Sequence, residues 1–158
     1  MPKFNGEIRL NENHLTMPLS WRKPTTIFWN AHGDTFHENT PIDAIDLMFG
    51  VISLTPHHIH QVLTKRPDRM DAYLADPLTP SRILQACEEF SELGIANPDD
   101  VPIVSLWPIP NVLLGVSVED QTTADTRREP MLRLSANSWS TTDSSRTMGN
   151  KPFLKQLL

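Results

Sequence analysis

Residues 57–70 read HHIHQVLTKRPDRM, and this stretch decides the fold because it places a strand directly before a helix. The apolar run from Ile59 to Leu63 is typical of a short strand. A short helix is expected from about Asp68 to Leu74, behind the proline of the TKRP segment. His57, His58 and His60 lie at the start of this strand, whereas Lys65 and Arg66 lie at its end.

A similar unit lies upstream. TTIFWN, residues 25–30, combines β-branched and aromatic residues, which predicts a buried strand. Thr40 has the side chain of an N-cap and Pro41 suits the first helical position, so a helix is expected to run to about Leu54. Its apolar face recurs at helical spacing and comprises Ile42, Ile45, Phe49 and Ile52.

The downstream sequence repeats the pattern. Thr79 is expected to cap another helix, with Gly94 as its stop. The segment 103–106 is expected to be extended, and NVLLGVSV, residues 111–118, is the third clear strand. A helix from about Asp120 to Leu134, broken near Pro130, is expected to follow.

This alternation of strands and helices is typical of parallel sheets built from right-handed crossovers. The fold class expected is therefore α/β, with at least three parallel strands. A complete eight-stranded barrel needs about 200 residues or more. A chain of 158 residues is too short for one, which leaves a partial (β/α) barrel.

Composition and charge limit the classes of function. The net charge of −5 and the lack of long basic runs give no support for nucleic-acid binding. The single cysteine, Cys87, excludes an internal disulfide framework and fits a reducing compartment. Neither a signal sequence nor a membrane-spanning apolar run is visible, so a cytoplasmic protein is expected.

Polar residues follow each predicted strand. In parallel α/β folds, functional groups gather at the carboxyl ends of the strands. The candidates are Asn30, His32, Asp34 and His37 after the first strand, Thr64, Lys65 and Arg66 after the second, and Ser117 and Glu119 after the third.

Several of these patterns have two interpretations. His58 and His60 could chelate zinc with a third ligand, or they could be hydrogen-bonded histidines at the start of a strand. Asp34, between two histidines, fits a metal or catalytic site, or a simple turn. Lys65 and Arg66 could bind a phosphate or carboxylate, or could pair with Asp68, Asp71 or a neighbouring helix. Close packing explains Gly115 as well as a ligand would, and Glu119 either accepts a hydrogen bond from a ligand or caps the next helix.

Four segments in this order carry a family resemblance: LSWRKPTTIFWNAHGDTFHE, HHIHQVLTKRPDRM, WPIPNVLLGVSVEDQTTADTR and PMLRL. Together they resemble the bacteriophage-associated gene-product 37/68 family, a group of uncharacterised proteins related to radical S-adenosylmethionine enzymes. The resemblance implies a partial (β/α)₆-type barrel whose strand ends surround an iron–sulfur cluster and S-adenosylmethionine. The residues that it places at the cofactor or substrate cavity are Asn30, Asp34, Thr64, Lys65, Arg66, Ser117 and Glu119.

The chain departs from this family at both ends. Relatives of this kind carry a cysteine-rich stretch upstream of the WRKP segment, whereas the 17 residues before Pro18 contain no cysteine. A cluster held by three thiolates is therefore not supported, and an enzyme is not favoured. The expected organisation is an N-terminal arm (1–17), a radical-SAM-like partial barrel (18–134) and an irregular Ser/Thr-rich tail (135–158), in a chain that looks truncated at both ends.

Three functional hypotheses follow. The first is a phage-type radical-SAM-like protein without radical chemistry, with S-adenosylmethionine as the ligand that the resemblance implies. The second is a module that binds a protein partner, such as a host factor, or associates with itself through open sheet edges. The third is a metal-dependent hydrolase in which His32, Asp34 and His37 serve as metal ligands or general base.

Overall fold

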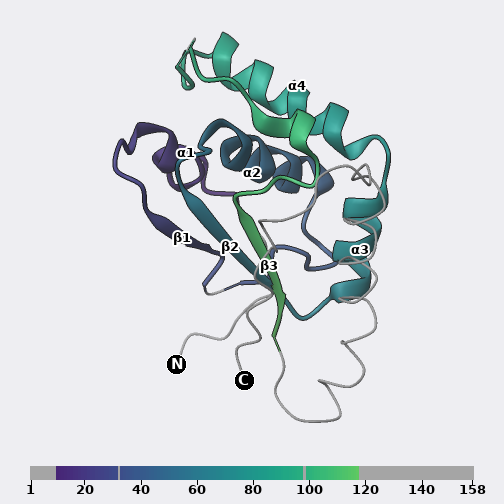
Figure 1. The fold of residues 1–158 in the computed structure, drawn as a ribbon. Coiled ribbons are helices and arrows are strands. Elements are labelled where there is room, and N and C mark those ends of the chain that lie inside the picture. Colours follow the sequence, from purple (N-terminus) through teal and green to yellow (C-terminus); the bar gives the residue numbers. More distant parts are fainter. Residues whose placement is uncertain (1–9, 32, 98, 118–158) are drawn as a thin grey trace, which may run out of the picture.

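The computed structural model describes residues 10–31, 33–97 and 99–117 (Figure 1). The elements in chain order are α1 (Glu12–Ser20), β1 (Thr26–Trp29), α2 (Ile42–Leu54), β2 (Ile59–Thr64), α3 (Pro67–Ala75), α4 (Thr79–Glu92), a 3₁₀ helix (Ile103–Leu106) and β3 (Val112–Val116). The strands form one parallel sheet in the order β1-β2-β3. The α/β class with three parallel strands and alternating helices is thus confirmed. The predicted helix at 120–134 and the tail at 135–158 lie outside the described residues.

The described helices leave one face of the sheet open. In β2, the alternating residues His60, Val62 and Thr64 are buried, whereas Ile59 and Leu63 are exposed. Figure 1 shows α1, α2 and α4 together on the covered side. The opposite side is called the open face, and the register assigns to it Thr26, Phe28, Ile59, Gln61, Leu63, Leu113 and Gly115.

This arrangement corrects the expectation for residues 25–30. A wholly buried strand was predicted, yet Phe28 is 44 % exposed and only Trp29 of β1 is buried. The aromatic and β-branched composition indicated a strand correctly. It could not show that β1 lies at an edge of the described sheet with helices on one side only.

Helix α2 is the centre of the core, between the sheet and α4. Phe49, Val51 and Ile52 have no exposed surface. Gly50 allows α4 to approach, because a Cβ there would lie 3.2 Å from the Cβ of Ala86. A helix covered on both sides must be apolar around most of its circumference, which is what the sequence of α2 provides.

The helix ends differ from two predictions and confirm a third. Thr40 is not the N-cap of α2, because the cap is Pro41, in an extended conformation. Thr79 is the first residue of α4, and its hydroxyl donates to the carbonyl of Tyr73 (2.7 Å) instead of capping the helix. Gly94 has a φ of +66° and ends α4 as predicted, with backbone hydrogen bonds typical of a Schellman motif.

Two further elements were not anticipated. Helix α1 crosses the expected boundary between the N-terminal arm and the barrel, and it is capped by the Asn11 side chain accepting from the His14 amide (3.2 Å) and anchored by buried Leu15. The segment 103–106, predicted to be extended, is a 3₁₀ helix. None of the described helices has the length and apolar character needed to cross a lipid bilayer.

Candidate functional site

Asp34 joins the loop after β1 to the carboxyl end of β2. Its Oδ1 accepts hydrogen bonds from the Thr64 hydroxyl (2.6 Å) and the Phe36 amide (3.0 Å). Its Oδ2 accepts from the Lys65 amide (3.0 Å) and from Nη1 of Arg66 (3.0 Å). The structure therefore brings together four of the predicted site residues, and the acceptor positions of the Asp34 carboxylate are all used within the chain.

These contacts determine the charge of Asp34. Burial alone raises the pKa of this carboxyl group, but the hydrogen bonds from Thr64, the two backbone amides and Arg66 outweigh that effect and lower it below its ordinary value. Asp34 is consequently ionised at neutral pH. With its side chain only 12 % exposed, it acts as a clamp between the ends of β1 and β2.

Arg66 extends the clamp toward solvent. Its Nε donates to Oε1 of Glu38 (3.2 Å), and its backbone amide donates to the Thr64 hydroxyl (2.9 Å). Of the two interpretations of the TKRP segment, the described contacts of Arg66 therefore show ion pairing, but with Asp34 and Glu38 and not with Asp68 or Asp71. Sequence reasoning missed Glu38, because no local pattern links it to a residue 28 positions away.

Thr64 and Lys65, at the carboxyl end of β2, differ in exposure. Thr64 is buried on the helix side, whereas Lys65 is exposed. The Ser117 amide donates to the Thr64 carbonyl (2.9 Å), which continues the ladder beyond the last residue of β3. Lys65 and Ser117 directly follow the last residues of β2 and β3, so they lie at the carboxyl end of the sheet.

The remaining predicted site residues are placed as follows. Asn30 has a φ of +52°, and its side chain donates to the Thr35 hydroxyl (2.7 Å). The Nδ1 atom of His37 accepts from the Asn39 amide (3.2 Å). His32 and Glu119 lie outside the described residues. Within the described ranges, no group of three His, Cys, Asp or Glu side chains is arranged to hold a metal ion, and the proposed His32–Asp34–His37 site stays a prediction.

The histidines at the amino end of β2 are hydrogen-bonded inside the chain. His58 and His60 have no exposed surface, and each uses both ring nitrogens. His58 contacts the Thr25 amide and the Pro18 carbonyl, and His60 contacts the indole of Trp29 and the Thr55 hydroxyl. Among the described contacts, this favours the interpretation of hydrogen-bonded histidines over zinc chelation.

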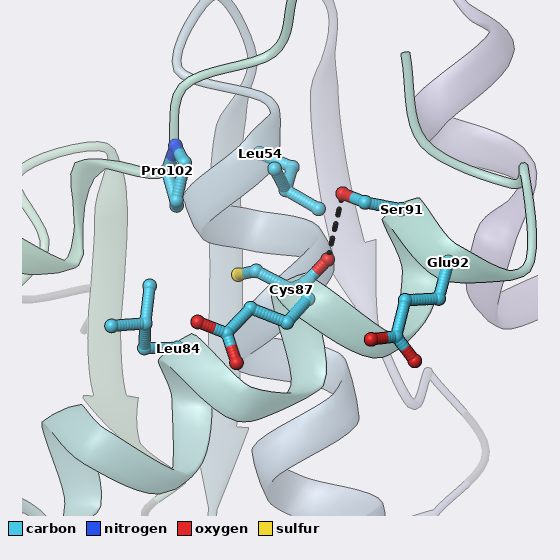
Figure 2. Close-up of a pocket in the computed structure, with 7 residues that line it drawn as sticks. Leu54, Leu84, Cys87, Ser91, Glu92 and Pro102 are labelled. Carbon is cyan, nitrogen blue, oxygen red and sulfur yellow. Dashed lines mark hydrogen bonds between the residues drawn. The ribbon is translucent and has the colours of Figure 1, made fainter. Parts of the chain in front are cut away.

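A pocket of about 430 Å³ lies in the helical layer, away from the strand ends. Figure 2 shows it beside Cys87 of α4, and its lining comprises Leu54, Leu84, Cys87, Glu88, Ser91, Glu92 and Pro102. Burial raises the pKa of the Cys87 thiol to about 11, so the thiol is protonated and unreactive at neutral pH. We therefore place the candidate site at the carboxyl ends of the strands and the adjoining open face.

Comparisons with known proteins give one match. No curated protein and no solved structure matches the chain. A family model described as "Protein of unknown function (DUF5131)" matches residues 2–151, almost the whole length. The chain therefore belongs to the DUF5131 family.

Proposed function

We propose that this protein is a phage-type relative of radical S-adenosylmethionine enzymes, folded as a partial barrel over about residues 18–134. In this proposal, its open face binds S-adenosylmethionine, and the chain supplies no radical chemistry of its own. The observation that carries the proposal is the open face itself, an apolar sheet surface with polar groups at the carboxyl ends of its strands.

The chemistry of the open face suits an amphipathic nucleoside ligand. Phe28, Leu63 and Leu113 are large apolar residues that remain partly exposed on it. Lys65 and Ser117 are polar residues that directly follow β2 and β3 at the carboxyl end of the sheet. Ligand sites combine an apolar surface with a few polar groups that fix orientation, and in α/β folds they lie at the carboxyl ends of strands.

Gly115 shapes this surface. A Cβ at position 115 would lie 2.5 Å from Cδ2 of Leu63, so the glycine leaves room for the Leu63 side chain above β3. Of the two explanations for Gly115, the structure supports close packing of a neighbour. The Leu63–Gly115 pair thus supports the proposal because it lets a large apolar side chain lie over β3 on the open face.

The residues present do not fit an iron–sulfur cluster. Such a cluster is held by several thiolates, and the 158 residues contain one cysteine. That residue, Cys87, is buried in α4, and its thiol donates to the Gly50 carbonyl of α2 (3.6 Å). Helix α4, which carries Cys87, lies on the side of the sheet opposite the open face (Figure 1).

Isothermal titration calorimetry with S-adenosylmethionine tests the proposal. The informative variant is Leu113→Gln on the open face, and the matched control is Leu84→Gln on α4, since the two leucines are 39 % and 42 % exposed. We expect saturable binding that weakens about tenfold in Leu113→Gln, a loss of roughly 1.4 kcal/mol, and is unchanged in Leu84→Gln. Absence of heat from the folded protein, or equal weakening in both variants, would contradict it.

A protein partner or a second copy of the chain is the alternative occupant of this surface. The feature that favours it is the same exposed apolar group, since contiguous apolar patches mark interaction sites. Size-exclusion chromatography with light scattering distinguishes a surface that binds a second copy of the chain from one that binds S-adenosylmethionine. Self-association that is abolished by Leu113→Gln, in a protein that gives no heat with S-adenosylmethionine, would support the alternative.

A further inference from the structure

His58 connects α1 and the segment after it to the amino end of the sheet. Its Nε2 lies 3.3 Å from the carbonyl oxygen of Pro18 in α1, and its Nδ1 accepts from the backbone amide of Thr25 (3.1 Å). The Trp21 ring meets the His58 ring edge-on, with centroids 6.1 Å apart. One buried imidazole thus holds α1, Trp21 and the residue before β1 in place.

The partners of His58 fix its tautomer. A backbone amide can only donate, so Nδ1 must be the unprotonated acceptor facing Thr25. A carbonyl can only accept, so Nε2 must carry the hydrogen that points to Pro18. The contact with Thr25 exists only for the neutral ring, whereas the contact with Pro18 is retained by the protonated ring. A second proton would have to be placed on Nδ1, where it would face the Thr25 N–H, donor against donor.

The carbonyls of Pro18 and Trp21 favour the protonated form of His58, but burial and the charge of His57 outweigh them and lower its pKa. The titratable neighbours are His57 and His60, with ring centroids 4.0 Å and 6.0 Å from that of His58. The Nε2 atom of His57 donates to the Trp21 carbonyl (2.9 Å), so its ring also holds this segment. Arg22 and Asp100 line the pocket beside His57, but the described contacts of His58 include no carboxylate.

We propose that His58 is an acid-sensitive latch, in which protonation breaks the hydrogen bond from Thr25 and releases α1 with residues 21–25 from the amino ends of β1 and β2. Release would expose Leu54 and Thr55, which are buried and which line a pocket of about 230 Å³ together with Trp21. Burial, followed by the charge of His57, lowers the pKa of His58, in agreement with a ring that is neutral while α1 is bound.

Hydrogen–deuterium exchange tests the latch in the intact chain. After correction for intrinsic rates, we expect residues 12–25 to exchange about tenfold faster at pH 5.5 than at pH 7.5, because a freed histidine with an ordinary pKa near 6.5 gains about one log unit of proton binding over that range. Residues of α4 should show no such change. An equal change of exchange rate with pH in residues 12–25 and in α4 would overturn the proposal.

Two variants isolate His58 from other histidines. In His58→Asn, the side-chain oxygen can accept from Thr25 but does not titrate, so the acceleration should disappear. His14→Asn, on the exposed side of α1, is the matched control and should keep it. An acceleration that persists in a folded His58→Asn protein would refute the latch.

Nuclear magnetic resonance of the wild-type protein provides a test that needs no variant. The latch requires the amide resonance of Thr25 to shift with the same midpoint as the ring resonances of His58. Titration of His58 with an unmoved Thr25 amide would overturn the proposal even if no variant folds.

Discussion

Acid should weaken the whole fold through His60, which lies deeper than His58. The Nδ1 atom of His60 accepts from the indole N–H of Trp29 (2.9 Å), and its Nε2 contacts the Thr55 hydroxyl (3.0 Å), which in turn donates to the Val51 carbonyl (2.6 Å). The indole N–H can only donate and the Val51 carbonyl can only accept, so Nδ1 of His60 carries no proton and Nε2 donates to the Thr55 hydroxyl. The His60 ring is therefore neutral. Burial, and to a lesser degree His58, lowers the pKa of His60 to about 4.

The direction and size of the effect follow from this pKa. The unfolded chain binds a proton at His60 near pH 6.5, whereas the folded chain does so only near pH 4. Stability from this residue is therefore fully present above pH 6.5 and declines as the pH falls toward 4. At pH 5 the expected loss in the free energy of unfolding is about 2 kcal/mol from His60 alone, and His58 adds a loss of the same sign.

Urea unfolding between pH 7.5 and pH 5 measures this loss. Asp34 and Asp76, whose pKa values are lowered, reduce stability only at more acidic pH, so this window isolates the histidines. In His60→Asn, the change in the free energy of unfolding between pH 7.5 and pH 5 should fall to the part contributed by His58, whatever the absolute stability of the variant. A free energy of unfolding that is unchanged between pH 7.5 and pH 5 would refute the reasoning.

Three substitutions test the packing and the clamp, each measured by urea unfolding. Asp34→Asn should lower the free energy of unfolding by about 2 kcal/mol, because it removes the charge that its donors surround. An unchanged free energy of unfolding would show that the hydrogen bonds of Asp34 do not stabilise the fold. Gly50→Val should cost about 1–3 kcal/mol, because its Cβ would press on Ala86 at 3.2 Å, and a neutral result would mean that α4 moves away freely. Tyr73→Phe should cost about 1–2 kcal/mol, because the buried Asp46 carboxylate loses a 2.7 Å hydrogen bond, and no loss would indicate that another donor replaces it.

The order of strands and helices was predictable because it depends on local patterns. TTIFWN, IHQVL and NVLLGV each have the composition of a strand, and each strand was found at the expected place to within a few residues. Tertiary features were not predictable in the same way. The exposure of Phe28 depends on which face the helices cover, and α1 depends on the burial of Leu15 and Pro18 against the rest of the fold.

The candidate site was predictable in position but not in its internal contacts. Because parallel strands end at the same edge of the sheet, Asp34, Thr64 and Arg66 could be expected to meet there, and they do. That Asp34 uses all its acceptors within the chain depends on loop geometry, which no spacing in the sequence encodes. The contact between Arg66 and Glu38 is likewise a product of folding.

The two ends of the sheet should respond differently to acid. At the carboxyl ends, Asp34 and Arg66 form a contact between charges, and the lowered pKa of Asp34 keeps that contact intact at pH 5. At the amino ends, the hydrogen bonds that the Nδ1 atoms of His58 and His60 accept exist only for neutral rings. Mild acid should therefore loosen the amino end, including α1, before it disturbs the clamp at the candidate site. Monitoring the amides of Lys65 and Thr25 in one pH titration would show this order directly, because Lys65 donates to Asp34 while Thr25 donates to His58. Simultaneous change of both amides would mean that the two ends unfold as one unit.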